Sequence, residues 1–414
     1  MRPPALSSRT ATAKISLPQR REPLIDLAYL APMRFFDNSA INRIYAHSAL
    51  LGLSEYSGGA FVFVFLLKAG IALPVLFLSL AAIVLMRLVF RQMVLPFAQR
   101  FGIRTSLVVG IAIGAVGYIP VGYIHDVGLM LALFLILAAL GDAFYWCCFH
   151  ATSARLGDAD ARGAQVSVVQ LVYSLSNVAG PLLGGFLQVA AGPVWAFLFA
   201  GAIRVLSVWP LLSTPNPVID RAAKIDAKSK RFAAQVYFFN GFENACTGNA
   251  FALALFITLG ENFQTFGFAL AGAAVFGAVM GLGIGRLFDL GHHKWSTAIG
   301  MCAICLFVIT AALGYHSAIT AIAALALGAI AGPLYASAFN ARAYNLSKAS
   351  GDALRFQIWG EGGWDLGCAL SSSIAALLVW MGFSFTWPIA IGLLGTAGVW
   401  FTLHQSYLKG EPSL

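Results

Sequence analysis

Five acidic residues stand inside long apolar stretches of this sequence: Glu55, Asp142, Glu243, Glu361 and Asp365. An ionisable side chain deep in a bilayer is tolerated only when it is paired, protonated or facing water. Removal from water favours the neutral carboxylic acid, so such a group can take up and release a proton. These residues are the candidates for proton coupling, with Glu55 and Glu243, near the middle of their stretches, as first choices. The alternative for each is a structural ion pair with a base such as Arg87, Arg155 or Arg342.

Polar and aromatic residues lie at similar depths and are candidates to line a mostly apolar cavity with a few orienting groups. They are Tyr56, Tyr145, Trp146, Gln170, Tyr173, Asn177, Tyr237, Asn240, Asn244, Tyr335, Trp359 and Trp364. Packing or interfacial aromatics are the alternative interpretation of each ring. Interior acids outnumber interior bases, because only Arg204 lies inside a stretch and the other bases stand at the ends. This balance disfavours strongly anionic solutes and favours a cationic, neutral or amphipathic organic molecule.

The elements that must position these side chains are membrane helices. Hydrophobic residues make up 59% of the 414 residues and charged residues 10%, and the mean hydropathy is +0.80, which is typical of an integral membrane protein. A bilayer core about 30 Å thick needs roughly 20 apolar residues per helical span. Twelve such segments lie near residues 45–67, 71–90, 105–124, 127–149, 164–191, 194–213, 233–259, 264–284, 295–314, 317–339, 356–381 and 384–404. The predicted fold class is all-α, with twelve transmembrane helices in two six-helix pseudo-symmetric halves.

Two parts of the sequence repeat at a spacing of 190 residues. Tyr145, Phe149 and Leu156 correspond to Tyr335, Phe339 and Leu346, and Gly58, Ala60, Phe61 and Gly70 correspond to Gly248, Ala250, Phe251 and Gly260. Two halves with matching landmarks are typical of transporters built from structural repeats. Positions that break the match, such as Glu55 against Ala245, are where we expect function to lie.

The repeat also divides the chain. We expect a cytoplasmic N-terminal tail at residues 1–43, with a segment able to lie on the membrane surface, and six-helix halves at 44–213 and 232–406. A cytoplasmic linker at 214–231 joins the halves, and a short cytoplasmic tail follows at 407–414. A charged linker of this kind would let one half rock against the other.

The position of the basic residues decides what the net charge of +9 means. Seven bases precede the first span, and most others lie in even-numbered connections, as expected for loops retained in the cytoplasm. Both termini of this multi-pass protein are therefore expected in the cytoplasm, with a bacterial inner (plasma) membrane as its location. The charge indicates topology and contact with anionic membrane lipids, not a nucleic-acid partner.

The connection between the second and third predicted spans resembles a signature of the major facilitator superfamily, Gly-x-x-x-Asp-Arg-x-Gly-Arg-Arg. Arg100, Gly102 and Arg104 match this signature, whereas Leu95 and Gln99 replace its glycine and aspartate. The connection after the eighth span keeps a glycine, a base and an acid. In that family the loop is a latch of the cytoplasmic gate, so the resemblance implies this role for Arg100, Gly102, Arg104, Gly285, Arg286 and Asp289. A turn with ordinary cytoplasmic positive charge is the alternative.

The fifth predicted span resembles the antiporter motif of the same family, Gly-x-x-x-Gly-Pro-x-x-Gly-Gly. Gly180, Pro181, Gly184 and Gly185 match it, with Ser176 at the first glycine. Glycines and a proline permit a kink and close helix contact, which would control leakage through the pathway. Simple packing of small residues is the alternative.

Metal, cofactor and nucleotide sites are not expected. Cys147, Cys148 and His150 suggest a metal site, but adjacent cysteines point to different faces of a helix. All six cysteines fall within predicted spans, so no disulfide framework is expected. The glycines at positions 281, 283 and 285 lack the Lys-Ser/Thr of a phosphate loop. No enzymatic activity is predicted.

The resemblance implies a secondary active transporter that moves a small organic solute across the membrane by alternating access. The buried acids favour protons over another coupling ion, and the motif in the fifth span favours export by antiport. Two alternatives stay open: a proton-coupled nutrient importer working by symport, and a non-transporting receptor or assembly factor with the same fold. The expected partners are the substrate, the coupling ion and membrane lipids, and the chain is expected to be a monomer.

Overall fold

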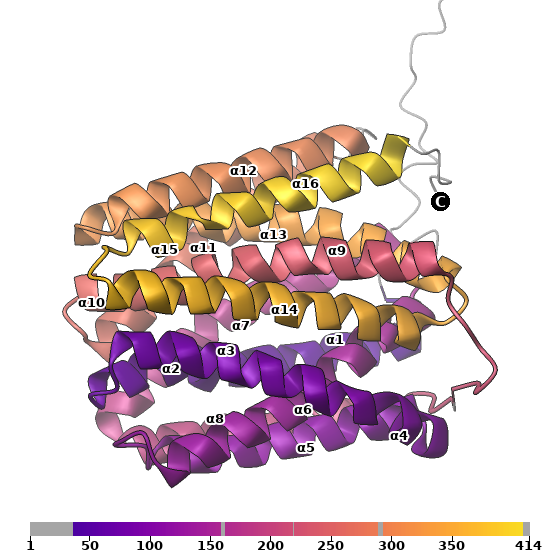
Figure 1. Ribbon diagram of the computed structural model, residues 1–414, viewed down its shortest axis with the longest axis horizontal. Helices are drawn as coiled ribbons and strands as arrows, with labels where there is room; N and C mark the ends of the chain where they lie inside the picture. The colour runs from indigo at the N-terminus through magenta and orange to yellow at the C-terminus, as the bar shows by residue number, and fades with distance from the viewer. Residues whose placement is uncertain (1–35, 159–161, 218, 289–292, 409–414) are drawn as a thin grey trace, which may run out of the picture. The chain divides into compact units, whose positions relative to one another are not determined.

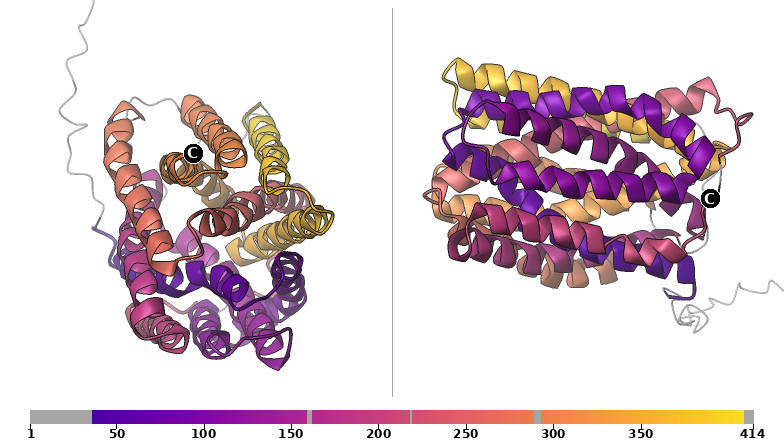
Figure 2. Two further views of the ribbon diagram at one scale, coloured as in Figure 1. Left: turned by 90° about the vertical axis from the view of Figure 1, so that its left-hand side faces the viewer. Right: turned by 90° about the horizontal axis from the view of Figure 1, so that it is seen from below.

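The computed structural model describes residues 36–158, 162–217, 219–288 and 293–408, which form helices and short turns without a strand (Figure 1). The first elements are α1 (Ser39–Ser54), η2 (Glu55–Gly59), α2 (Ala60–Lys68), α3 (Leu73–Phe90), η3 (Arg91–Met93), α4 (Val94–Phe101), α5 (Ile103–Val121), α6 (Leu129–Leu156), α7 (Arg162–Ala190), α8 (Pro193–Leu206) and η4 (Trp209–Ser213). The later elements are α9 (Ala227–Asn244), η5 (Ala245–Ala250), α10 (Phe251–Thr258), α11 (Phe263–Phe288), α12 (His293–Gly314), α13 (Ala318–Ala349), α14 (Ala353–Trp380), α15 (Thr386–Ala390) and α16 (Gly392–Leu408). The helices run side by side, with the earlier ones (indigo to magenta) mostly gathered apart from the later ones (orange to yellow) (Figure 2).

Ten helical segments in the described part of the chain are long and apolar enough to cross a membrane. A further apolar helix, Ala298–Gly314 within α12, is shorter. The continuous rod formed by α9, η5 and α10 is not among the ten, because its first half carries charged and polar side chains, including Lys228, Lys230, Arg231 and Glu243. The prediction of an all-helical, multi-pass membrane protein is therefore confirmed, while ten segments, not twelve, qualify as spans by length and composition.

The long helical rod formed by α3, η3 and α4 extends through residues 91–101, where the sequence predicted a connection between two spans. η3 and α4 follow α3 without a break, so Leu95 and Gln99 lie on a helix that ends at Phe101. The chain turns at Gly102, whose φ of +88° is readily adopted only by glycine. A Cβ at this position would also lie 2.2 Å from the Asn216 side-chain oxygen. The glycine of the signature is thus required by backbone conformation and by space.

Two π-helical segments interrupt the long rods, and they begin 190 residues apart. η2 starts at Glu55 and η5 starts at Ala245, so the spacing of the sequence repeat reappears in the backbone (245 − 55 = 190). π-Helical turns are rare and often occur at functional sites. η2 begins at one predicted coupling acid, and η5 begins two residues after the other, Glu243.

Glycines bring neighbouring helices into backbone contact. A Cβ at Gly367 of α14 would lie 1.9 Å from the Phe238 carbonyl oxygen of α9, and one at Gly110 of α5 would lie 2.6 Å from the Tyr145 nitrogen of α6. Small residues are the usual means by which membrane helices pack closely, because lipid removes most of the hydrophobic driving force. α14 therefore packs closely on α9, and α5 on α6.

Candidate functional site

Arg204 of α8 binds two of the predicted acids. Its guanidinium donates to Glu55 at 2.6 Å and to Asp142 at 3.1 Å. The Arg204 side chain is only 6% exposed, whereas the side chains of Glu55 and Asp142 are 35% and 28% exposed. Two carboxylates share one guanidinium, so this cluster carries one net negative charge when all three groups are ionised. The two carboxylic side chains are therefore the part of the cluster that is accessible to solvent.

Two glycines provide the space that this cluster needs. A Cβ at Gly114 of α5 would lie 2.6 Å from the central carbon of the Arg204 guanidinium, and one at Gly59 of η2 would lie 2.9 Å from a Glu55 carboxylate oxygen. Real Cβ atoms do not approach other groups so closely. The glycines therefore leave room for the acid at the start of η2 and the base on α8 in the positions that they adopt.

A cavity of about 190 Å³ lies beside the Arg204 cluster. Its charged lining residues are Glu55, Asp142, Arg204 and Arg87, and its rings come from Phe63, Tyr118, Phe134 and Trp364. The remaining wall is aliphatic or glycine. A mostly apolar wall with a few charged groups is typical of a site for a small organic molecule, although drug-sized ligands occupy roughly 300–1,000 Å³. In this conformation the cavity therefore suits a compact solute.

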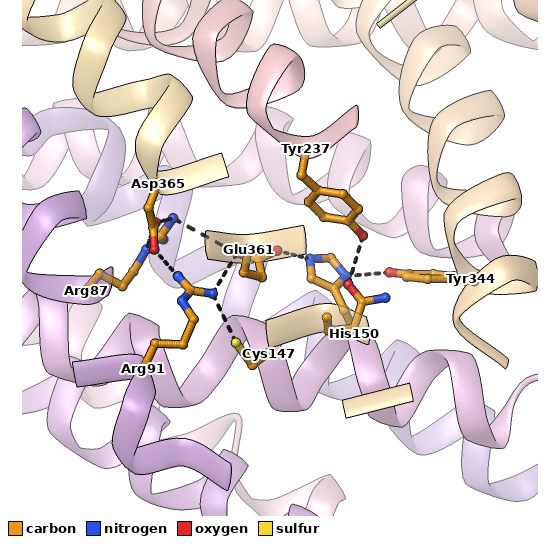
Figure 3. A network of polar contacts seen from close by, with 9 residues as sticks. Arg87, Arg91, Cys147, His150, Tyr237, Tyr344, Glu361 and Asp365 are labelled. Carbon is orange, nitrogen blue, oxygen red and sulfur yellow. Dashed lines mark hydrogen bonds and ion pairs between the residues drawn. The ribbon is translucent and has the colours of Figure 1, made fainter. Parts of the chain in front are cut away.

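A second charge cluster joins α3 and η3 to α14 (Figure 3). Asp365 is fully buried and accepts hydrogen bonds from both Arg87 and Arg91. Glu361, one turn earlier on α14, lies 4.0 Å from Arg87 and 3.9 Å from Arg91. The Arg87 guanidinium also lies over the Trp364 ring, 4.6 Å from its centroid. Two bases face two acids, and such a buried arrangement is tolerated because every charge has a partner.

His150 extends this second cluster to α6 and α13 (Figure 3). One ring nitrogen lies 3.6 Å from a Glu361 oxygen, and the other shares a hydrogen bond of 2.7 Å with the Tyr344 hydroxyl. Arg91 also donates to the Cys147 sulfur at 3.1 Å. The cysteine and histidine that suggested a metal site are thus part of a polar network. This network links helices before the linker, α3 and α6, with helices after it, α13 and α14.

Glu243 differs from the other four acids, because no ion pair joins it to a base within the described ranges. It is 3% exposed, and its carboxylate accepts a hydrogen bond of 2.8 Å from the Thr247 hydroxyl on the next turn. α16 packs directly against it, since a Cβ at Gly395 would lie 2.8 Å from the Glu243 Cβ. The carboxyl is therefore enclosed between α9 and α16 with a neutral partner.

The partners of the paired acids were only partly predictable. Arg87 was named as a possible partner, but the acids pair with Arg91 and Arg204 as well. The expectation that Arg204 is the only interior base is wrong, because Arg87 and Arg91 are 4% and 1% exposed and lie within the candidate span Leu73–Phe101. They are interior because η3 and α4 prolong the rod beyond Phe90. A signal was available: two bases four residues apart on one span complement two acids, Glu361 and Asp365, four residues apart on another.

The predicted cavity residues are distributed over several places. Trp364 lines the 190 Å³ cavity, and Gln170 lines a smaller one of about 40 Å³ between α1, α6, α7 and α13. Asn240 donates to the Tyr335 hydroxyl at 2.8 Å. The others line neither cavity: Tyr56, Tyr145, Trp146, Tyr173, Asn177, Tyr237, Asn240, Asn244, Tyr335 and Trp359.

Several of these residues pack or bond elsewhere. Tyr145 contacts His47 at 3.1 Å, and Tyr237 donates to Gln357 at 2.9 Å. Trp359 is 48% exposed, with the Lys230 ammonium 5.6 Å from its ring centroid. For such residues the packing interpretation describes the observed contacts.

The first predicted gate segment holds the start of the linker. The Arg104 guanidinium donates to the carbonyls of Leu212 and Thr214, both at 2.8 Å. The Asn216 side chain accepts from the Arg104 backbone N–H at 3.0 Å and donates to the Phe101 carbonyl at 3.0 Å. Arg100 lies over the ring of Phe101. In the second segment, Gly285 and Arg286 belong to α11, but their side chains and Asp289 lie outside the described residues. The linker therefore begins as an anchored segment.

The non-helical part of the predicted linker 214–231 ends at Asp226, the N-cap of α9, so the last five residues of the linker are helical. The Asp226 carboxylate accepts hydrogen bonds from the Ser229 backbone N–H at 2.8 Å and from its hydroxyl at 2.6 Å. These bonds favour the ionised form and lower the pKa of Asp226. The residue is fully exposed, so α9 begins at a solvated N-cap.

The antiporter-like glycines pack α7 between two other helices. A Cβ at Gly180 would lie 2.5 Å from the Tyr56 Cβ, and one at Gly184 would lie 2.3 Å from the Ser57 carbonyl oxygen in η2. On the other side, a Cβ at Gly185 would lie 2.7 Å from the Phe263 carbonyl oxygen of α11. Pro181 lies inside α7. The motif therefore provides close contact on both faces of the helix.

Comparison with known proteins agrees with this fold. The sequence profile described as Major Facilitator Superfamily matches residues 48–235. The Multidrug resistance protein MdtH of Shigella flexneri serotype 5b (strain 8401) is 29% identical over 154 residues, which cover 35% of this chain and 38% of that protein. The match thus spans less than half of that relative. Residues 48–235, just under half of the chain, are therefore similar to the major facilitator superfamily.

Solved structures extend the likeness of fold to most of the chain. A POT family transporter in complex with a thioalcohol-conjugated peptide is similar with a TM-score of 0.62 at 14% identity, over 89% of this chain and 96% of that one. The human organic anion transporter MFSD10 (TETRAN) is similar with a TM-score of 0.60 at 14% identity, over 87% and 99%. At such identities the likeness concerns the fold alone.

Proposed function

We propose that this chain is a secondary active transporter that moves a small organic solute by alternating access between two six-helix halves. The first half comprises the elements from α1 to η4, and the second those from α9 to α16. The α9–α10 rod and α12 would complete a set of twelve spans. The paired π segments, which keep the 190-residue spacing, support this symmetry. The protein would work as a monomer in the inner membrane, with both termini in the cytoplasm.

The observation that carries this proposal is the cavity beside the Arg204 cluster. Its exposed charged atoms belong mainly to Glu55 and Asp142, and their two carboxylates share one base. A compact organic cation would complete the charge balance, while the rings and aliphatic groups of the wall would cover its apolar part. A strongly anionic solute would meet repulsion from the accessible acids.

We assign proton coupling first to Glu243. A carboxylate enclosed by α9 and α16, with a hydroxyl as its hydrogen-bond partner, would be costly in an apolar interior, whereas the protonated acid is tolerated. Loading and unloading a proton at this position would therefore change how α9 packs on α16. Glu55 and Asp142 are the second choice, because a cation that enters the cavity competes with Arg204 for them. Glu361 and Asp365 serve the inter-helix network.

Export by proton antiport is the direction we favour. The name of the similar protein MdtH refers to multidrug resistance, and the glycine motif in α7 resembles an antiporter motif. Proton-coupled import would use the same cavity and the same acid, so the direction of flux decides between the two. A receptor with this fold would bind a solute without moving it.

Reconstituted vesicles with an imposed pH gradient test this proposal. The wild-type protein should accumulate at least one member of a panel of organic cations, and Glu243→Gln should abolish the component driven by the gradient while exchange of labelled for unlabelled solute persists. The matched control is Glu261→Gln, since Glu261 is an exposed acid outside the cavity. Gradient-driven flux that is equal in both variants would exclude Glu243 as the coupling group. Absence of flux for the whole panel would favour a receptor.

A further inference from the structure

The parts of the chain before and after the linker contribute unequally to the wall of the cavity beside the Arg204 cluster. Sixteen residues line it, and fifteen of them precede the linker, from Glu55 in η2 to Arg204 in α8. The sixteenth is Trp364 of α14, the one lining residue that follows the linker in the described part of the chain. A site that belongs to the first half is thus closed on one side by a single indole from the second half.

Trp364 is fixed to the second half by close backbone contacts. A Cβ at Gly241 of α9 would lie 2.2 Å from the Trp364 carbonyl oxygen, and Gly367 on the next turn meets the Phe238 carbonyl in the same way. α14 can therefore shift relative to α3 without leaving α9. The indole would move with the second half, while the other fifteen residues stay with the first.

The indole is also joined to the charge network between the halves. The Arg87 guanidinium lies over its ring, lines the cavity and pairs with Asp365, the residue next to Trp364. Separation of α3 from α14 would break the ion pairs and withdraw the indole together. Arg87 and Trp364 therefore line the cavity and also take part in the contact between the two halves.

A ligand can shift a conformational equilibrium only by binding the two states unequally. Fifteen wall residues that move together would offer the ligand largely the same contacts in both states, although Arg87 among them would lose its partner Asp365 when the halves separate. The main difference would therefore come from the indole, which would touch the ligand only when the halves are closed on this side. An aromatic face attracts a cation within about 6 Å. Arg87 already lies over one face of the ring, so a bound organic cation would use the other face, and this contact would favour the closed state.

We propose that Trp364 determines which cations the protein can carry, by coupling their binding in the first half to closure by the second half. This inference rests on the proposed function and adds a residue and a substrate property to it: the cation must be compact and must present a face to the indole. Binding itself is provided by the Glu55 and Asp142 wall, and Trp364 converts binding into occlusion.

A cysteine reporter in the cavity tests this proposal. Ala138 lines the cavity, so the variant Ala138→Cys can be labelled with 2-(trimethylammonium)ethyl methanethiosulfonate in the purified full-length protein, with the wild type as the background for native cysteines. Adding Trp364→Ala should speed this labelling about fivefold or more, the lower limit of typical coupling between sites. Trp359→Ala, which removes an exposed tryptophan of the same helix, should leave the rate unchanged.

A second readout separates coupling from simple binding. Tetraethylammonium should protect the introduced thiol at similar concentrations in Ala138→Cys with and without Trp364→Ala, because the fifteen-residue wall is intact. In vesicles, the maximal rate of tetraethylammonium flux should fall about 5- to 150-fold in Trp364→Ala with little change in its KM. Trp364→Phe keeps a ring and packs with less disturbance, so it should restore part of the rate and serves if the alanine variant does not fold.

The outcomes are distinct. Equal labelling rates in the Trp364→Ala and Trp359→Ala backgrounds would overturn the role of Trp364 as a closing wall. Loss of protection and loss of flux in equal proportion would overturn coupling, because the indole would then be an ordinary binding contact. If the wild type transports no cation but Trp364→Ala still accelerates labelling and Trp364→Phe does so less, the closing wall stands and the transport proposal fails.

Discussion

Replacement of Asp365 by asparagine would remove the centre of the buried charge network. The carboxylate is fully buried and accepts from Arg87 and Arg91, both of which are also nearly inaccessible. Asparagine has almost the same volume, so the variant changes charge without creating a cavity. Glu361, 4.0 Å and 3.9 Å from the two guanidinium groups, would remain as their nearest acid.

The expected loss of stability follows from the two bases left with insufficient negative charge. Removing one partner of a buried ion pair typically costs about 3–5 kcal/mol. Because 1.4 kcal/mol is a factor of ten, this corresponds to a change of roughly 100- to several-thousand-fold in the unfolding equilibrium. The network joins α3 and α6 to α13 and α14, so we also expect greater access of water-soluble labels between these helices in Asp365→Asn.

Detergent-induced unfolding of the purified protein, followed by circular dichroism, measures this effect. Asp126→Asn is the matched control, because Asp126 is an exposed aspartate in a loop and its replacement should change stability by less than about 0.5 kcal/mol. The double variant Asp365→Asn/Arg91→Gln should recover part of the loss, since one of the unpaired charges is gone. Equal stability of Asp365→Asn and Asp126→Asn would show that the network contributes little, and the reasoning from buried charge would be refuted.

Two further predictions concern a contact between helices and the anchor of the linker. Gly367→Ala places a Cβ 1.9 Å from the Phe238 carbonyl oxygen, so overpacking should lower the free energy of unfolding by about 1–3 kcal/mol. The control is Gly272→Ala, which has no atom within 4 Å of the new Cβ and should be nearly neutral in the same unfolding assay. Asn216→Ala removes the hydrogen bonds that join the linker to the Arg104 turn, so limited proteolysis should cut the linker faster than in the wild type; an unchanged rate would mean that the anchor is dispensable.

Much of the fold could be predicted because hydropathy and glycine act locally. The apolar stretches specify helices, and their lengths identify ten segments that the structure also assigns as candidate spans. The 190-residue spacing of the sequence repeat also separates the starts of the two π segments, Glu55 and Ala245, although these two residues differ in type. The turn at Gly102 was marked by its glycine, although the helix before it is longer than expected.

The charge partners could not be predicted in the same way. Arg87 and Asp365 are far apart in the sequence, and their contact depends on how α3 and α14 pack. The rotation of each helix about its axis decides whether a base faces an acid, a cavity or lipid. Glu55 and Glu243 were both first choices for proton coupling in the sequence, yet Glu55 is paired with Arg204 and Glu243 has a hydroxyl partner.

The sequence by itself determined that this is a helical membrane protein with acids inside its apolar stretches and with motifs that resemble those of the major facilitator superfamily, because apolar length, charge placement and short motifs are properties of single segments. Only the tertiary structure decided which acids are paired, which one stands without a base in the described part of the chain, and which residues line the cavity. Those features arise where helices meet. Their energies depend on distances between side chains that no single segment contains.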